Sequence, residues 1–215
     1  MKFGKRGFFS FVLTAAFLYS VAQPTRASIE LYGFIATDAG YNFNSIDPDW
    51  FDVMRPTKLP KFPNEFGSQG NAYFSVRQTR LGVKSIVPTP IGDLKTRFEF
   101  DQFGFGKDAG QTTFHLINAW GEIGKFGAGQ TSSVFMDLDV FPVTLDYWGP
   151  MTRVFNFNVQ VRYTPILTDK SKLAFALERP GGKADGGDFA NTIELGNVRP
   201  VFQLPNLTAH YRKEM

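Results

Sequence analysis

The sequence predicts an all-β protein, an antiparallel transmembrane β-barrel of which about eight strands are present. Of its 215 residues, 24 are Phe and 21 are Gly, a composition that favours strands and tight turns. Apolar and polar residues alternate over segments longer than the roughly five to six residues of an average soluble strand. The connections between these segments alternate between long and short, as they do in outer-membrane barrels.

Residues 1–27 are predicted to be a cleaved secretory signal peptide. Cations precede an uncharged apolar run over residues 7–22, and small residues permit cleavage after Ala22 or after Ala27. A transmembrane helix is the alternative, but the run is short for one and no stop-transfer charges follow it. Residues 28–215 then belong to the barrel domain.

The charge balance and the absence of cysteine exclude several classes of protein. The formal charge of +3 includes four signal-peptide cations, so the remaining chain carries −1 and offers no basic surface for nucleic acid. Without cysteine there is no disulfide, thiolate metal ligand or thiol nucleophile.

The first predicted strand covers residues 29–43. Its odd-numbered positions carry no charge over eight successive places. A tilted strand needs about 9–11 residues to cross a bilayer, so this segment is long enough to span one.

The second predicted strand, residues 71–85, changes its pattern part of the way along. Its apolar residues lie at even positions before Gln78 and at odd positions after it. Either a β-bulge near Gln78 switches the two faces, or Arg77 and Arg80 do not share one face.

The third predicted strand, residues 94–103, separates charged from apolar side chains completely. The sequence LKTRFEFDQF places Lys95, Arg97, Glu99 and Asp101 on one face. In a barrel the apolar face contacts lipid and the charged face lines the water-filled lumen. The alternative is an exposed sheet face of a soluble secreted protein that binds a small ligand.

Five further strands and two classes of connection complete the prediction. The strands are expected at residues 112–123, 125–131, 155–164, 173–178 and 206–212. The long loops are 44–70, 132–153 and 181–205, whereas 86–93, Gly124 and 165–171 are short turns. We expect the long loops on one side of the membrane and the short turns on the other.

Several blocks of the chain, among them SVRQTRLGVKS and GDLKTRFEFDQFG, resemble successive blocks of Gram-negative general porins, most of all the DcaP-like trimeric porins. The resemblance covers roughly residues 28–212. It implies a sixteen-stranded barrel in outer-membrane lipid, a homotrimer, and passive uptake of small anionic solutes such as dicarboxylates, with no cofactor. Because the first predicted strand directly follows the signal peptide and the sequence ends at AHYRKEM, we expect neither the family's N-terminal coiled coil nor its aromatic-ended closing strand in this chain. The chain is therefore predicted to be the N-terminal half of such a porin, although a self-closing eight-stranded barrel is an alternative.

The resemblance also implies that the loop after the fifth strand, Ser132–Pro150, folds into the pore and faces basic wall residues. That loop contributes Asp137, Asp139 and Asp146, and a field between acidic loop and basic wall would select solutes by charge. The predicted pore-lining residues are Arg77, Arg80, Lys84, Lys95, Arg97, Glu99, Asp101, Asp137, Asp139, Asp146 and Arg162.

The sequence contains no pattern that points to catalysis or to metal binding. His115 and His210 are the only histidines and have no second ligand at a suitable spacing, and Ser132 and Ser133 have no adjacent base. The protein is therefore predicted not to be an enzyme, and an enzymatic or adhesive outer-membrane barrel is a minor alternative.

Overall fold

A computed structural model describes residues 27–147, 149, 154–168, 170–181 and 201–214. The predicted signal peptide and most of the 181–205 loop lie outside the described residues. The strands are β1 (Ser28–Phe34), β2 (Asp38–Asn42), β3 (Asn71–Ser75), β4 (Arg80–Thr89), β5 (Gly92–Phe103), β6 (Thr112–Ile123), β7 (Phe126–Ser132), β8 (Phe157–Leu167), β9 (Ser171–Glu178) and β10 (Asn206–Lys213). Short 3-10 turns are η1 (Pro48–Trp50), η2 (Pro56–Lys58), η3 (Gly106–Asp108) and η4 (Leu138–Val140).

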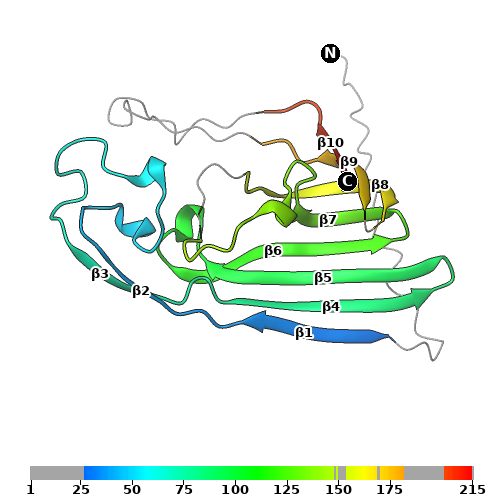
Figure 1. Ribbon diagram of the computed structural model, residues 1–215, viewed down its shortest axis with the longest axis horizontal. Helices are drawn as coiled ribbons and strands as arrows, with labels where there is room; N and C mark the ends of the chain where they lie inside the picture. Colours follow the sequence, from blue (N-terminus) through cyan, green and yellow to red (C-terminus); the bar gives the residue numbers. More distant parts are fainter. Residues whose placement is uncertain (1–26, 148, 150–153, 169, 182–200, 215) are drawn as a thin grey trace, which may run out of the picture.

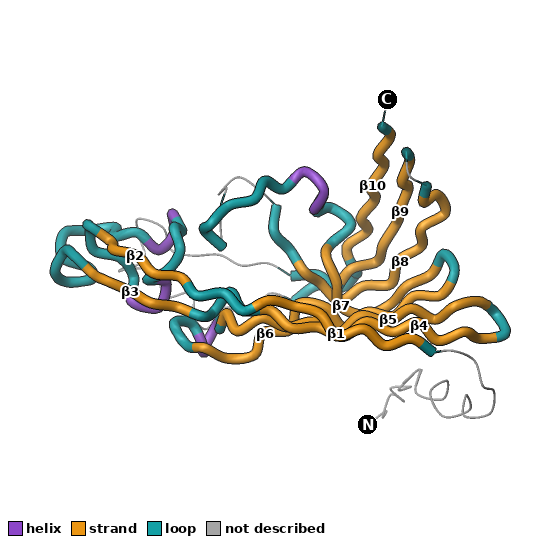
Figure 2. The backbone as a smooth tube through the Cα atoms, turned by 60° about the horizontal axis from the view of Figure 1, so that its bottom comes forward, coloured by secondary structure: helices purple, strands orange, loops and turns teal. Residues whose placement is uncertain are grey.

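Eight strands form one curved antiparallel sheet in the order β1-β4-β5-β6-β7-β8-β9-β10, and β2 pairs with β3 in a separate ribbon (Figure 1). Strands β8 to β10 turn away from the plane of β1 to β7, so the sheet has a concave side (Figure 2). The predicted all-β antiparallel fold is confirmed. Among the described residues β1 and β10 are the two ends of the sheet, so these strands do not close into an eight-stranded barrel.

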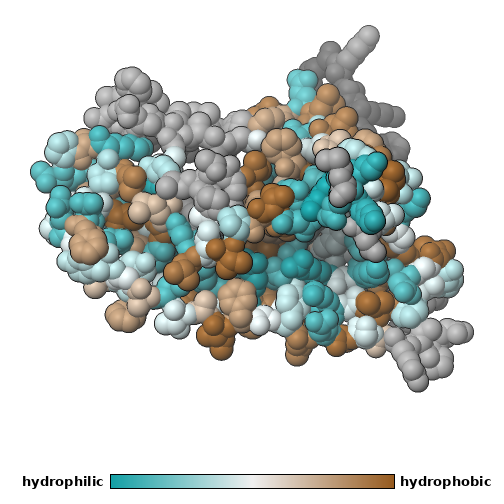
Figure 3. All heavy atoms as spheres, in the orientation of Figure 1, coloured by the Kyte–Doolittle hydropathy of each residue, from teal (hydrophilic) through white to brown (hydrophobic). Residues whose placement is uncertain are grey.

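The sheet is apolar on its outer, convex face and polar on its inner, concave face, which is the opposite of a water-soluble protein. On the convex side Leu31, Phe114 and Leu207 have exposed fractions of 79%, 76% and 76%. On the concave side Glu99 and Gln160 are buried. Hydrophilic side chains gather over the middle of the face seen in Figure 3, and hydrophobic ones along its lower border. An apolar exterior around a polar interior is the pattern of a sheet between lipid and water.

The first predicted strand is not continuous, and the second contains the irregularity that its parity change predicts. β1 ends at Phe34, paired with Arg80, and β2 begins at Asp38, paired with Ser75. Three residues, 35–37, therefore lie opposite four, 76–79. The extra residue makes a β-bulge that switches the outward parity from even to odd. The Thr79 hydroxyl accepts from the Ala36 N–H, at 3.2 Å, and links the two sides of the break.

The other predicted strands match the structure closely. β6 covers the predicted residues 112–123, and β4 and β5 extend toward each other until only Pro90 and Ile91 separate them. The turn predicted at 86–93 is therefore shorter than expected. None of the helices in the described part of the chain is long or apolar enough to cross a membrane.

Two aromatic rings lie flat on glycines of the neighbouring strand. A Cβ atom at Gly82 would stand 2.4 Å from the Tyr32 ring, and one at Gly127 would stand 2.0 Å from the Trp120 ring. Both rings lie on the concave face, because Tyr32 pairs with Gly82 and Gly127 pairs with the inward-facing Arg162. Any side chain at these positions would lift the ring from the sheet.

A small apolar cluster joins two long loops and the end of β5 at one end of the sheet. Trp50 and Val53 from the 43–70 loop pack with Phe103 at the end of β5 and with Tyr147 from the loop after β7. The rings of Phe103 and Tyr147 stack with centroids 4.4 Å apart. The long loops are therefore fixed to each other and to the sheet.

Candidate functional site

The connection between β7 and β8, residues 133–156, begins by binding to the concave face of β9 and β10. Glu178, which is buried, accepts hydrogen bonds through one carboxylate oxygen from the Ser133 hydroxyl, the Val134 N–H and the Thr208 hydroxyl, at 2.9, 2.9 and 2.8 Å. Val134 packs against Ala174 and Ala176 of β9. Small residues on β9 thus leave room for the loop, and one carboxylate fixes its start.

The other end of the same loop binds to β5, on the far side of the concave face. The Tyr147 hydroxyl donates to Asp101 Oδ2 at 2.6 Å, and Gln78 Nε2 donates to the Leu145 carbonyl at 3.2 Å. Burial, together with the negative charge of Asp101, raises the pKa of Tyr147 well above its ordinary range. Tyr147 therefore stays neutral at physiological pH, and its hydroxyl group continues to donate a hydrogen bond to Asp101.

A groove of about 310 Å³ lies between this loop and the wall of the sheet. The loop side is mostly apolar and includes Leu138, Phe141 and Val143, with Asp146 toward its end. The wall side is polar, and its main contributors are Gln78, Arg80, Arg97, Glu99, Asn118 and Thr131.

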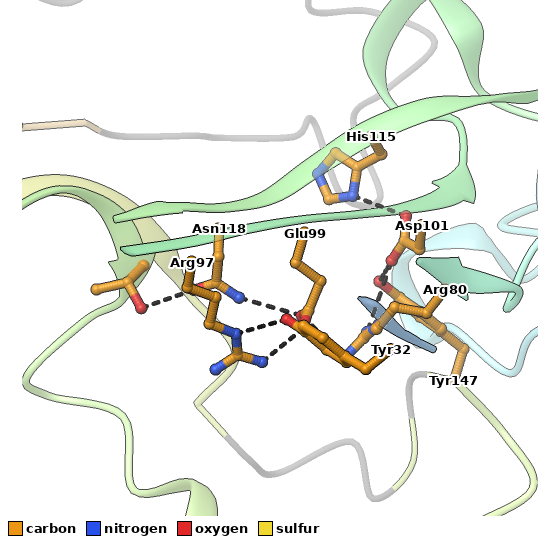
Figure 4. Close-up of polar contacts among 9 residues, drawn as sticks. Tyr32, Arg80, Arg97, Glu99, Asp101, His115, Asn118 and Tyr147 are labelled. Carbon is orange, nitrogen blue, oxygen red and sulfur yellow. Dashed lines mark hydrogen bonds and ion pairs between the residues drawn. The ribbon is translucent and has the colours of Figure 1, made fainter. Parts of the chain in front are cut away.

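The polar wall is organised around two buried carboxylates of β5 (Figure 4). Arg80 lies 3.6 Å from Glu99 and 3.7 Å from Asp101, and Arg97 Nη2 lies 2.6 Å from Glu99 Oε2. The Tyr32 hydroxyl donates to Glu99 and accepts from Arg97 Nε. Each carboxylate is thus held by at least two partners, as buried charge requires.

Neighbouring strands extend this network. Asn118 of β6 donates to Glu99 Oε1 at 3.1 Å and accepts from the Thr131 hydroxyl of β7 at 2.7 Å. His115 Nδ1 lies 3.1 Å from Asp101 Oδ1. The network links β1, β4, β5, β6 and β7 along the wall beside the groove.

Two predicted pore-lining lysines are exposed on the same face. Lys84 pairs with Arg97 across the strands, and its Nζ lies 4.3 Å from the centroid of the Tyr32 ring. Lys95 is exposed two residues before Arg97. The predicted cations Lys84, Lys95, Arg80 and Arg97 therefore share the concave side with Glu99 and Asp101.

Arg77 is the predicted residue whose position differs most from expectation. It lies in the bulge with an exposed side-chain fraction of 1%, so it does not line the groove. Its Nε donates to Asp52 Oδ2 at 2.9 Å, and Nη2 makes a second, short bond to Asp52. The bulge directs Arg77 under the 43–70 loop, where its guanidinium lies 4.1 Å from the Phe103 ring centroid. Arg77 therefore holds a loop in place.

The three predicted loop carboxylates do not form a common acidic face toward the basic wall. Asp137 and Asp139 lie 3.6 and 2.6 Å from Arg212 Nη1 on β10. Asp146 lies beside the groove and accepts the Met54 N–H at 3.2 Å. We expected an acidic loop opposite a basic wall. Instead, the loop side of the groove is largely apolar, and Asp137 and Asp139 form ion pairs with Arg212 of β10.

Arg162 lies on the concave face but outside this groove. It donates to Gln160 Oε1 at 3.1 Å and to the Ser132 carbonyl, and its guanidinium lies 5.2 Å from the centroid of the Trp120 indole ring.

Sequence reasoning missed Tyr32, Tyr147 and Glu178. The even-numbered position of Tyr32 in its strand could have placed it on the polar face. Tyr147 and Glu178 depend on contacts between distant segments. Within the described ranges no group of three or more His, Asp or Glu is placed to hold a metal ion.

Comparisons with known proteins agree with this architecture. The family model of the DcaP outer membrane protein matches residues 20–214. The crystal structure of the outer membrane channel DcaP of Acinetobacter baumannii is similar with a TM-score of 0.67 and 23% identity, over 87% of this chain and 49% of that one. The chain thus spans about half the length of that channel, and at this identity the likeness shows the fold alone. No curated protein sequence matches the chain.

Proposed function

Because the chain belongs to the DcaP outer membrane protein family, we propose that it forms part of the wall of a water-filled passage across the outer membrane, through which small anions of the dicarboxylate class diffuse. The observation that supports this proposal is the groove between the inward-folded loop and a wall that carries Arg80 and Arg97. A convex apolar face favours this function over that of a soluble secreted binder, because exposed apolar area of this extent is unfavourable in water.

The accessibility of the charges supports a preference for anions. The side chains of Arg97 and Arg80 are 41% and 27% exposed, whereas Glu99 and Asp101 are 1% and 0% exposed. Lys84 and Lys95 are exposed as well. A solute in the groove therefore contacts the cations directly, while the carboxylates that position them lie behind. Charges in a narrow passage concentrate ions of the opposite sign.

Further features of the proposal follow from the resemblance to trimeric porins. The protein works as a homotrimer in outer-membrane lipid, its wall is completed to about sixteen strands, and it has no enzymatic activity. The long loops and the short turns lie on opposite sides of the membrane.

The proposal predicts that Arg97→Gln reduces anion preference. In planar bilayers under a salt gradient, the anion-to-cation permeability ratio from the reversal potential should fall about twofold at low salt, because one accessible charge is lost beside the groove. The effect should shrink toward 1 M salt, where the Debye length is about 3 Å.

The matched control is Lys107→Gln, which removes an exposed cation from the β5–β6 connection away from the groove. It should leave the permeability ratio unchanged. A wild-type passage without anion preference, or equal effects of both substitutions, would contradict the proposed selectivity.

A further inference from the structure

A second cavity, of about 450 Å³, opens on the concave face at the end that carries the short turns. It lies beside the β6–β7 turn at Gly124 and the end of β8 at Leu167, whereas the groove under the loop lies farther along the strands. Besides Phe126 and aliphatic residues, its lining includes Trp120, Glu122, Lys125, Arg162, Thr164 and Lys172.

Arg162 supplies this cavity with a positive charge that forms no ion pair with a carboxylate of the described residues, although Glu178 and Glu122 are near enough to attract it electrostatically. The partners of its guanidinium are neutral oxygens of Gln160 and Ser132. Of the ion pairs between described residues, none includes Arg162. A half-buried arginine that bonds to neutral acceptors keeps its affinity for a carboxylate or phosphate oxygen.

The other charges of the cavity add to this excess. Lys125 and Lys172 line it from the β6–β7 turn and from β9, and neither takes part in an ion pair within the described ranges. Glu122 is the carboxylate among the lining residues, and its Oε2 accepts the Trp120 indole N–H at 3.1 Å. Three cations therefore face one carboxylate that is already hydrogen-bonded.

We propose that this cavity is a second subsite of the passage, which binds the carboxylate groups of a small di- or tricarboxylate between Arg162 and Lys172. The inference rests on the proposed function, since the same solutes would cross the groove beside Arg97. Because the subsite lies at the short-turn end, it holds solute at that mouth of the passage. Its volume accommodates a solute with two or three carboxylates.

The test measures how citrate blocks the current of small ions through the protein. The protein is purified from outer membranes and inserted in one orientation into planar bilayers. Citrate added on the short-turn side should block the wild type. Arg162→Gln should raise the half-blocking concentration from that side about tenfold, equivalent to roughly 1.4 kcal/mol. Lys172→Gln should raise it as well, and that substitution keeps the Arg162 contact to Ser132 intact.

Lys170→Gln is the matched control. Lys170 is exposed in the turn between β8 and β9, two residues before Lys172, but does not line the cavity. Block that is unchanged in both Arg162→Gln and Lys172→Gln would overturn the subsite, even where Arg97→Gln still reduces anion preference and so upholds the proposed function. Loss of anion preference in the wild type would overturn both. A titration calorimetry measurement of citrate binding to the same variants should show the same order.

Discussion

Replacement of Asp52 by Ala is expected to lower the free energy of unfolding by about 3–5 kcal/mol, the cost of a buried charge left without its partner. Asp52 and Arg77 have side chains that are 2% and 1% exposed, and two hydrogen bonds join them. Arg77 also lies between the rings of Phe51 and Phe103, where water cannot replace the lost carboxylate. Equilibrium urea unfolding in phospholipid vesicles, followed by far-ultraviolet circular dichroism, measures the difference.

A more accessible ion pair in the same loop provides the control. Lys58 and Asp47 lie 3.5 Å apart with side chains 36% and 16% exposed, so Lys58→Ala should cost less than about 1 kcal/mol. Joint replacement of Asp52 and Arg77 by Leu should recover much of the loss, since no charge then remains buried. A cost for Asp52→Ala as small as that for Lys58→Ala would show that Arg77 reaches water.

Replacement of Glu178 by Ala is expected to release the start of the 133–156 loop from the sheet and to lower the free energy of unfolding by about 3 kcal/mol. One of its carboxylate oxygens accepts from Ser133, Val134 and Thr208, and the change removes the acceptor of the buried Ser133 and Val134 donors, whereas the half-buried Thr208 hydroxyl keeps a second contact to the Ala176 carbonyl. Because the loop covers the concave face, single-channel conductance should rise as the loop leaves it. Urea unfolding and conductance recordings measure the two effects.

Glu178→Gln is the control, because its amide oxygen can still accept the three bonds. The natural absence of cysteine also permits a direct measurement: cysteines introduced at Val134 and Ala176, which pack together, should form a disulfide in high yield. That yield should fall in the Glu178→Ala background and persist with Gln. Undiminished cross-linking in Glu178→Ala would mean that packing alone holds the loop.

The sheet could be predicted from the sequence because each strand carries its own signal. Lys95, Arg97, Glu99 and Asp101 alternate with apolar residues, and this local pattern identified the concave side of β5 without knowledge of its neighbours. The parity change around Gln78 likewise located the bulge. The break between β1 and β2 was missed because residues 35–37 keep the alternation and the extra residue lies on the partner strand.

The contacts of the loops could not be predicted in the same way. Arg77 pairs with Asp52 at a sequence separation of 25 residues, and Arg212 pairs with Asp139 at a separation of 73. Such pairs are determined by the curvature of the sheet and by which loops fold inward, and neither leaves a periodic trace in the sequence. The sequence located the acidic residues of the loop but not their partner, Arg212, because that contact depends on how β10 curves toward the loop.

The glycines beneath Tyr32 and Trp120 have a consequence for the width of the proposed passage. With their rings flat against Gly82 and Gly127, two of the largest side chains on the concave face take up little of the cross-section. One methyl group at either glycine would tilt a ring away from the sheet. The Tyr32 hydroxyl bonds to Glu99 and Arg97, and the Trp120 indole N–H bonds to Glu122, so the tilt would also displace charged groups of the wall. In the proposed passage, a change of one carbon atom at Gly82 or Gly127 is therefore expected to alter the width of the passage and the arrangement of its charges together.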